Sequence, residues 1–532
     1  MIRFFNSLVQ RKEEFQPRTE GKVGIYCCGP TVYGLLHIGN ARPYVTFAVL
    51  RSWLRRRGYE VTLVENITDV DDKIIKRATA EGRTSDEVAA EFTAAYHADM
   101  ERLGRALRPD IEPLATQSVP EIVDLCCTLI QKGHAYEAHG SVYFRVKSFP
   151  AYGKLSGQRI DELEQGVRIV NEPGKEDPLD FAVWKAAKPG EPAWESPWGM
   201  GRPGWHIECS AMGLRYLGPG FDVHGGGRDL IFPHHENEIA QSESAGLPFA
   251  RFWMHNGMIR SGGEKMAKSV GNIFLLREVL DRYADAAHGD APVVLLYFLT
   301  THYRSPLEFS VEKLEEAKAS YERLAGCVRD LDFRLAHADA AGGAAELSER
   351  ADRARDAFGG HMDDDLNTAA ALGEVFALVG DTYRCLAAMD GAGASADAAG
   401  LGHVRQTIAD LLDVLHIRVP APGVTGESGV TEGADGVNVR GEAGFEQRAS
   451  CLTGHVPLPP ASRLAEEGRW DDLEFLYRER LECGDPTYTV ALRDHYRAGK
   501  KWAESDRLRD ELQAAGFELR DTKLGTQVVA RS

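Results

Sequence analysis

Four side chains that could bind one metal ion lie far apart in the chain. Cys28 follows a short apolar run, Cys209 lies in the middle third of the sequence, and His234 precedes Glu238 by four positions. A spacing of four places His234 and Glu238 on one face of a helix. Two thiolates, an imidazole and a carboxylate suit Zn²⁺ in a tetrahedral site. The spacing is irregular, so a second interpretation stays open, in which Cys209 is a small buried apolar residue and the histidine caps a helix.

A second pattern is suited to phosphate chemistry. Residues 23–28 form a short apolar run that predicts a buried strand, Gly29-Pro30 ends it, and His37-Ile38-Gly39-Asn40 precedes a helix predicted over residues 41–57. The first turn of a helix after a central parallel strand binds anions through free N–H groups. Gly39 lets a ring or phosphate approach the backbone, and His37 can donate a hydrogen bond to phosphate. We predict a nucleotide site here; the alternative is an ordinary structural histidine.

Two lysines form the third candidate. Lys265 and Lys268 lie three apart in a basic loop that follows Gly262-Gly263. Ammonium groups on such a loop can reach a polyphosphate and neutralise the charge that develops on a leaving pyrophosphate. The alternative is a solvated surface loop.

The elements around these residues predict how they meet. The strand at 23–28, the helix at 41–57 and a strand at 61–64 form a β-α-β unit, which indicates a doubly wound parallel sheet. Further strands are predicted at 221–224 and 252–259, and a helix at 234–245. Ends of parallel strands meet at one sheet edge, so Cys28, Cys209, His234 and Glu238 could converge there. Neither a GxxxxGK[ST] loop nor a GxGxxG after the first strand is present.

The fold class we expect is α/β: a Rossmann-like catalytic domain with an insertion, then an α-helical bundle and a small C-terminal α/β module. The insertion is rich in Pro, Gly and Trp, and the later segments have helical periodicity. The predicted boundaries are 1–115 and 204–310 for the two halves of the catalytic domain, 116–203 for the insertion, 311–419 for the bundle, 420–460 for a flexible linker and 461–532 for the last module.

Composition narrows the class of protein. The chain has 532 residues, 43% of them hydrophobic, with a formal net charge of −18 and nine cysteines. Its longest apolar stretch is too short for a membrane span, and the N-terminus does not resemble a secretion signal, so we expect a cytoplasmic protein. Nine cysteines in such a chain do not form a dense disulfide framework. The negative charge disfavours broad nucleic-acid affinity, so any such binding needs local basic patches.

Together these motifs resemble the class I aminoacyl-tRNA synthetases, and within them the cysteinyl-tRNA synthetases. His37-Ile38-Gly39-Asn40 and Lys265-Met266-Ala267-Lys268-Ser269 resemble the two ATP-binding motifs of the class. Longer stretches that match the family begin at Tyr26, Asn66, Gly204, His224, Met362 and Lys501. The resemblance covers nearly the whole chain apart from about residues 420–460.

The resemblance implies roles for particular residues. It places one Zn²⁺ on Cys28, Cys209, His234 and Glu238. It assigns ATP binding to His37, Gly39, Asn40 and Lys268, catalysis to His37, Asn40, Lys265 and Lys268, and substrate binding to Gly29, Thr31, Thr68, Trp205 and Asp229. Trp205 would close over the substrate, and Asp229 would take its ammonium.

Two departures from the class pattern are visible. Asn40 stands where the class motif has a second histidine, so a role that needs an imidazolium is in doubt; Ala267 replaces the usual serine in the lysine loop. We expect activity to survive both changes, because an amide still donates a hydrogen bond and both lysines remain.

The implied activity is that of a cysteine–tRNA ligase. Cysteine would attack the α-phosphate of ATP with Mg²⁺ present, and the cysteinyl group would pass to the 3′ end of tRNA(Cys). Zinc would select cysteine over serine through its thiolate. We expect a monomer with no membrane partner. Two alternatives remain: a cysteine:aminosugar ligase with the same adenylating core, and a non-catalytic tRNA- or zinc-binding homologue.

Overall fold

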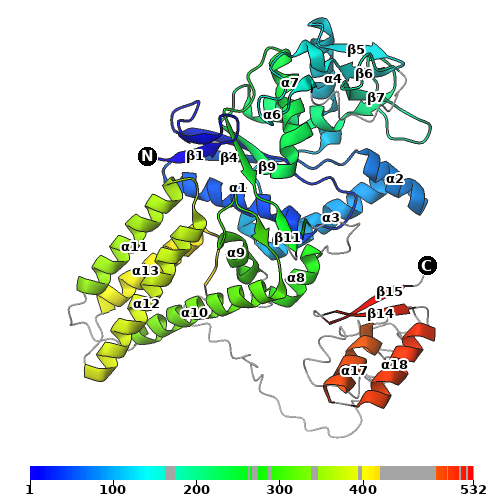
Figure 1. Ribbon diagram of the computed structural model, residues 1–532. Coiled ribbons are helices and arrows are strands. Elements are labelled where there is room, and N and C mark those ends of the chain that lie inside the picture. The colour runs from blue at the N-terminus through cyan, green and yellow to red at the C-terminus, as the bar shows by residue number, and fades with distance from the viewer. Residues whose placement is uncertain are drawn as a thin grey trace, which may run out of the picture. The chain divides into compact units, whose positions relative to one another are not determined.

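A computed structural model describes residues 1–161, 174–261, 264–265, 274–284, 290–336, 345–392, 398–419, 487–499, 501–514, 517–522 and 525–530. The chain divides into two compact units, Met1–Thr425 and Gly426–Ser532 (Figure 1). In the part of the chain that is described, no helix has the length and apolar character needed to cross a bilayer.

A four-stranded parallel sheet organises the first unit. Its strands, in spatial order, are β10 (Phe252–Asn256), β9 (Val223–Gly227), β3 (Lys22–Cys27) and β4 (Glu60–Glu65). Helix α1 (Ile38–Arg56) connects β3 to its neighbour β4. This is the predicted Rossmann-like arrangement, and the expected fold class is confirmed.

Helix α1 lies against the sheet so closely that one strand position requires glycine. A Cβ on Gly225 of β9 would lie 2.3 Å from the ring of Phe47 and 2.1 Å from the carbonyl oxygen of Met254. Because these distances are far below van der Waals contact, only glycine permits both the strand pairing and the packing of the helix. Phe47 itself is fully buried.

The insertion between β4 and β9 carries its own antiparallel sheet, with β5 to β8 in spatial order. In Figure 1 this sheet lies beside α4 and α7, in cyan and green. Its elements, with the helices that precede them, are α2 (Asp72–Glu81), α3 (Ser85–Leu103), η1 (Arg105–Leu107), η2 (Ala115–Ser118), α4 (Val119–Gln131), β5 (Ala135–Ala138), β6 (Ser141–Phe144), η3 (Val146–Ser148), β7 (Phe181–Ala186) and β8 (Gly201–Pro203).

Between β8 and β10 the chain forms α6 (Trp205–Leu217), η4 (Arg228–Leu230), the kinked segment η5 (Ile231–His235) and α7 (Glu236–Ser244). The predicted helix at 234–245 was therefore wrong at its start. Phe232 has an extended backbone (φ −137°, ψ 131°), so the regular helix begins only after η5.

The strand predicted at 252–259 is also two elements. Strand β10 ends at Asn256, and β11 (Ile259–Ser261) begins a separate small sheet. Between them, a Cβ on Gly257 would lie 2.2 Å from the carbonyl oxygen of Ser305, so the chain passes close to another backbone there. The remaining elements of this region are β1 (Arg3–Asn6), β2 (Arg11–Glu14), β12 (Glu264–Lys265), α8 (Leu276–Tyr283), α9 (Pro292–Leu299) and β13 (Leu307–Glu308).

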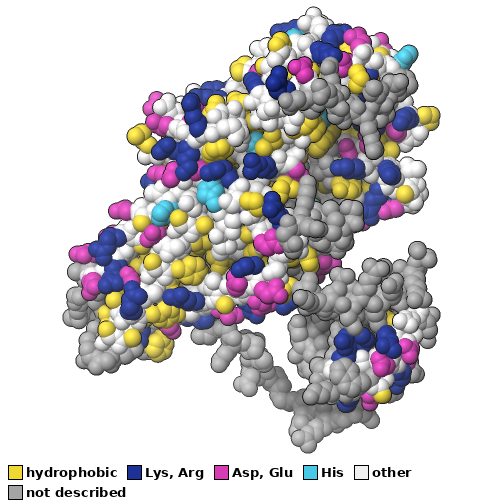
Figure 2. All heavy atoms as spheres, in the orientation of Figure 1, with side chains coloured by type: hydrophobic (Ala, Val, Ile, Leu, Met, Phe, Trp, Pro, Cys, Tyr) yellow, Lys and Arg dark blue, Asp and Glu magenta, His cyan; other side chains and the backbone are white. Residues whose placement is uncertain are grey.

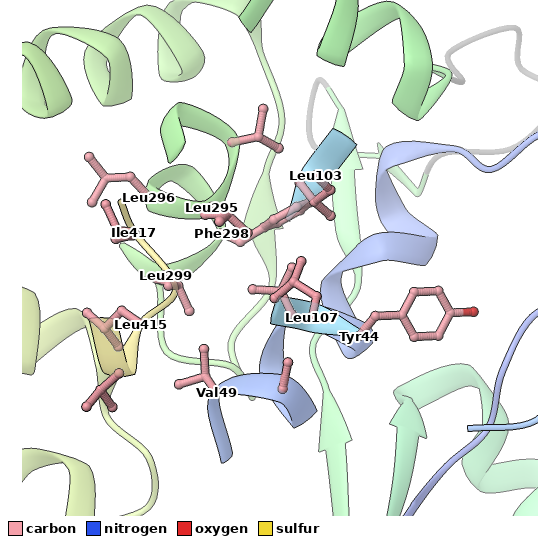
Figure 3. Close-up of a cluster of buried hydrophobic side chains, with 14 of the residues drawn as sticks. Tyr44, Val49, Leu103, Leu107, Leu295, Leu296, Phe298, Leu299, Leu415 and Ile417 are labelled. Carbon is pink, nitrogen blue, oxygen red and sulfur yellow. The ribbon is translucent and has the colours of Figure 1, made fainter. Parts of the chain in front are cut away.

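Four helices follow the sheet region: α10 (Val311–Ala336), α11 (Ala345–Asp363), α12 (Thr368–Ala392) and α13 (Ala398–Val414). Figure 3 shows how they join the sheet region through apolar packing: Leu415 and Ile417, just after α13, lie beside Val49 of α1 and Leu299 of α9. All four side chains are buried, so the helices and the sheet share one core.

The second unit, taken by itself, has two helices and a hairpin among its described residues. These are α17 (Thr487–Ala498), α18 (Trp502–Ala514), β14 (Phe517–Thr522) and the antiparallel β15 (Gly525–Ala530). The linker predicted at 420–460 lies outside the described residues.

Candidate active site and metal centre

A pocket of about 320 Å³ opens at the carboxyl ends of the parallel strands. Gly227 and Asn256, the last residues of β9 and β10, line it, and so does Cys28, which follows β3. Ligands of open α/β sheets bind at this edge. Eight of the predicted site residues line the pocket: Cys28, Gly29, Thr31, His37, Gly39, Asn40, Trp205 and Asp229.

The turn that precedes α1 forms one wall. His37 is the N-cap; its backbone N–H donates to the Asn40 side-chain oxygen at 3.1 Å, and the Asn40 N–H donates to the His37 carbonyl oxygen at 2.9 Å. A Cβ on Gly39 would lie 2.9 Å from Nδ1 of His37, so the glycine leaves room for the imidazole. The turn therefore presents a histidine and the first helical N–H groups to the pocket.

Asn40 acts here through its backbone-capping oxygen. Because an amide oxygen accepts the His37 N–H, the residue at this position closes the first turn of α1 without carrying a charge. The helix starts at Ile38 rather than at residue 41 as predicted, since the His37–Asn40 exchange of hydrogen bonds adds a turn.

Buried metal-ligand side chains gather directly behind the pocket. Ligand atoms of Cys28, His234, His235 and Glu238 all lie within 4.8 Å of one another, and all four residues are buried. The Cys209 sulfur lies 3.8 Å from that of Cys28. The structure thus gathers three of the predicted residues, Cys28, His234 and Glu238, with His235, whose Nε2 lies 3.4 Å from the Cys28 sulfur, and it places Cys209 beside Cys28.

The distances between these donors suit a small divalent ion. Two sulfurs at about 2.3 Å from one tetrahedral Zn²⁺ would lie about 3.8 Å apart, and the sulfurs of Cys28 and Cys209 are 3.8 Å apart. Nε2 of His234 lies 3.0 Å from Oε1 of Glu238, and the Cys28 sulfur lies 3.8 Å from the same oxygen. Soft sulfur, nitrogen and oxygen donors in one buried group are what zinc prefers.

Burial disfavours the charged forms of these groups in the absence of a cation. It raises the pKa of the Cys28 thiol and of the Glu238 carboxyl well above their usual values, and it lowers the pKa of His234. A bound dication reverses this balance for the thiol and the carboxyl, because it stabilises thiolate and carboxylate directly.

Outer contacts orient the cluster. Nε2 of His224, on β9, lies 2.7 Å from Oε2 of Glu238, and its Nδ1 lies 3.2 Å from the Tyr26 carbonyl oxygen. Nδ1 of His235 lies 2.8 Å from Nε2 of His255 on β10. The sheet itself therefore holds two of the cluster's side chains, as is common for metal ligands.

The predicted substrate residues occupy three different settings. The Trp205 ring stacks on His234, with centroids 4.2 Å apart and planes at 25°, so it connects the cluster to the pocket. Asp229 lies on η4 at the pocket wall. Thr68 does not line the pocket; it is buried, and its hydroxyl donates to Glu208 at 3.0 Å.

The lysine loop is mostly outside the described residues. Lys265 ends the short strand β12, and Lys268 lies beyond the described part of the loop.

Sequence reasoning missed two histidines that contact the predicted ligands, His224 and His235. The signal for His224 was its place at the end of the strand predicted at 221–224, although in the structure this strand, β9, runs from Val223 to Gly227 and His224 lies near its start, paired with Tyr26. For His235 the doublet with His234 was visible in the sequence, but no local pattern predicted the kinked backbone of η5 that precedes α7.

Comparisons with known proteins place the chain among the class I synthetases. The family model described as "tRNA synthetases class I (C) catalytic domain" matches residues 14–319, and the "DALR domain" matches residues 357–417. A cysteine–tRNA ligase of Nitratidesulfovibrio vulgaris is 43% identical over 98% of this chain and 99% of its own length. One from Carboxydothermus hydrogenoformans is 51% identical over 71% of this chain and 80% of its own.

Solved structures agree on the fold. Methionyl-tRNA synthetase of Mycobacterium tuberculosis, in complex with methionyl-adenylate, is similar with a TM-score of 0.55 at 16% identity, over 74% of this chain and 90% of that one. The ternary LeuRS–tRNA–LeuAMS complex from Agrobacterium radiobacter K84 gives 0.55 at 13% identity, over 76% of this chain and 85% of that one.

Proposed function

Because the chain belongs to the cysteine–tRNA ligase family of class I tRNA synthetases, we propose that it joins cysteine to tRNA(Cys) through a cysteinyl-adenylate formed from ATP. The observation that carries the proposal is the adjacency of two sites: a buried thiol, imidazole and carboxylate cluster stands directly behind a pocket walled by a helix N-terminus. One site suits a thiol substrate, and the other suits a nucleotide.

ATP binds, in this proposal, against the turn from His37 to Asn40. The first N–H groups of α1 and the His37 side chain would hold phosphate oxygens, and Gly39 allows close approach. Lys265 and Lys268 would neutralise charge on the phosphates together with Mg²⁺. Positioning and charge stabilisation account for most of the rate enhancement, since adenylation needs no covalent enzyme intermediate.

Cysteine binds with its sulfur toward Cys28, Cys209, His234 and Glu238, which would hold one Zn²⁺. Zinc so held would supply a Lewis-acidic centre that can add the substrate as a further ligand, and it would bind a thiolate far better than the hydroxyl of serine. The contact with His224 would orient Glu238, and Trp205, which stacks on His234, would close over the substrate. Asp229 would accept the ammonium group. Gly29 and Thr31 line the same wall, whereas we assign Thr68 a supporting role through Glu208.

Gly29 is required at this wall because a Cβ there would lie 1.6 Å from the Asn66 carbonyl oxygen. Its N–H donates to the Asn66 side-chain oxygen at 3.1 Å, and that same oxygen lies 3.6 Å from the Cys209 sulfur. Asn66 thus joins the pocket backbone to the metal cluster.

The domain assignment follows from the same proposal. Residues 1–115 and 204–310 form the two halves of the catalytic domain around the insertion at 116–203, and the bundle at 311–419 includes the DALR match. Residues 420–460 connect this unit to an anticodon-binding module at 461–532.

The basic residues of that module divide into two kinds. Arg493 is buried, which argues against direct contact with RNA. Arg507 and Arg509 are paired with acidic neighbours, at 3.7 Å from Glu511 and 3.1 Å from Asp506. On the face drawn in Figure 2, Lys and Arg alternate with Asp and Glu, so recognition of tRNA would depend on local contacts rather than on a broad positive field.

Three measurements test the proposal. The purified protein should catalyse cysteine-dependent exchange between ATP and pyrophosphate, contain zinc, and charge tRNA(Cys). Exchange without charging, with an amine accepting the cysteinyl group instead, would favour the aminosugar ligase. Absence of exchange in zinc-loaded protein would leave only a binding homologue.

A further inference from the structure

The pocket carries one charged side chain of each sign. Among its described lining residues, Asp229 is the only carboxylate and Lys73 is the only lysine or arginine. An amino acid brings an ammonium and a carboxylate into such a pocket. We propose that Lys73 binds the α-carboxylate of the substrate cysteine, opposite the ammonium site at Asp229. This inference rests on the proposed function and adds a substrate-binding residue to it.

Lys73 lies beside the aromatic ring that reaches from the pocket to the metal cluster. Its Nζ is 5.2 Å from the ring centroid of Tyr33 and 5.9 Å from that of Trp205, and both rings line the pocket. The Trp205 ring also stacks on His234, at 4.2 Å between centroids. One indole therefore separates the ammonium from the metal cluster. In cysteine the carboxylate carbon is three bonds from the sulfur, so a substrate held by its sulfur extends along this ring toward Lys73.

The charge of Lys73 is available to a ligand. In the described part of the chain, no ion pair involves its ammonium, and its side chain is exposed at the pocket rim. The two acidic residues before it are engaged elsewhere. Asp71 caps α2 by accepting the Lys73 backbone N–H at 2.9 Å, and Asp72 pairs with Lys185 at 2.6 Å and with Arg202.

The same contacts fix where Lys73 stands. Lys185 belongs to β7 and Arg202 to β8, so Asp72 ties the first turn of α2 to the sheet of the insertion. Arg202 is buried and also contacts Glu191 at 3.3 Å, which holds its guanidinium in place. Asp72 and Arg202 are positioning residues in this proposal. Their contact fixes the position of the first turn of α2, and that turn places Lys73 at the pocket.

An ammonium at this position suits the chemistry of adenylation. The substrate carboxylate must stay ionised to attack the α-phosphate, and it approaches an anion as it does so. A lysine offers a compact positive charge with three donors, which suits a carboxylate that must stay ionised beside another anion. Lys73 would thereby reduce the repulsion between the two reactants and orient the attacking oxygen.

The test compares Lys73→Met and Lys73→Arg with Lys76→Met, a control on the exposed face of the same helix that does not line the pocket. In ATP–pyrophosphate exchange, Lys73→Met should raise the KM for cysteine about tenfold or more, because a hydrogen bond to a charged group is lost. The KM for ATP should change little. Lys73→Arg should recover most of the affinity, and Lys76→Met should match the wild type.

Cysteamine, which is cysteine without its carboxylate, separates carboxylate binding from a structural role. As a competitive inhibitor it should bind the wild type and Lys73→Met equally well. Equal weakening of cysteine and cysteamine would show that Lys73 only shapes the pocket, and an unchanged KM for cysteine would also overturn the inference. A wild type without cysteine-dependent exchange would instead count against the proposed function.

Discussion

Glu65, at the end of β4, gives a stability prediction whose size follows from the structure. Its carboxyl is buried and accepts a hydrogen bond from the Tyr96 hydroxyl. Burial raises its pKa from 4.5 to about 8; the Tyr96 hydrogen bond acts in the opposite direction but does not offset burial. Because the folded pKa lies above the unfolded one, the folded chain binds more protons between these two values, and stability falls as the pH rises through that window.

The change to test is Glu65→Gln, which keeps the shape and the oxygen that accepts from Tyr96 but cannot ionise. At pH 7 the unfolded carboxyl is ionised while the folded one is protonated, and about 2.5 pH units at about 1.4 kcal/mol each give a cost of about 3 kcal/mol. The variant should therefore be more stable than the wild type by about 3 kcal/mol at pH 7 and by less than about 1 kcal/mol at pH 5.

Urea unfolding of both proteins at pH 5, 6, 7 and 8 measures this difference, with equal m-values as the condition for comparing midpoints. Glu60→Gln is the control, because Glu60 begins the same strand but is exposed and pairs with Lys22 at the surface. A difference between Glu65→Gln and the wild type that does not vary with pH, or a variant less stable at pH 7, would refute the reasoning.

Three further changes have expected outcomes. Arg42 donates to the carbonyl oxygens of Gly257 at 2.7 Å and Ser305 at 2.8 Å. Arg42→Met should lower the free energy of unfolding, measured in urea titrations, by about 3 kcal/mol, because two buried acceptors lose a charged donor. A decrease of less than about 1 kcal/mol would contradict this prediction. Gly29→Ala should severely reduce cysteine-dependent ATP–pyrophosphate exchange, since the added Cβ would lie 1.6 Å from a backbone oxygen. Exchange at the wild-type rate would contradict this prediction and show that the backbone around residue 29 can shift. If Cys209 is a zinc ligand, Cys209→Ser should lower the zinc content of the purified protein, measured by metal analysis, about tenfold or more. If the variant retains one zinc per chain, His235 rather than Cys209 would be the fourth ligand.

The parallel sheet was predictable because its signals are local. The apolar run before Gly29, the periodic helix after it and the next apolar run each occupy a few consecutive residues, and the handedness of β-α-β connections leaves few alternatives. The start of α1 was missed by one turn, because its cap is a His37–Asn40 exchange rather than a serine, threonine or aspartate signal.

The candidate site was predictable only as a set of residues. Sequence spacing placed His234 and Glu238 on one helical face, and their side-chain atoms do lie 3.0 Å apart. It did not reveal that η5 turns His235 toward the same sulfur, or that Thr68 faces Glu208 instead of the pocket. These outcomes depend on backbone torsions and on packing between segments distant in sequence, which no local pattern encodes.

The order of strands in the sheet has a consequence for how the chain is made. Strand β3 pairs on one side with β4, which follows soon after it, but on the other side with β9, where Ile25 meets Val223 roughly 200 residues later. A ribosome adding about 5–20 residues per second needs about 10–40 s to supply that partner. During this interval the nascent β3 has an unpaired edge and an incomplete thiol cluster, and an unpaired strand edge is a template for pairing with another chain.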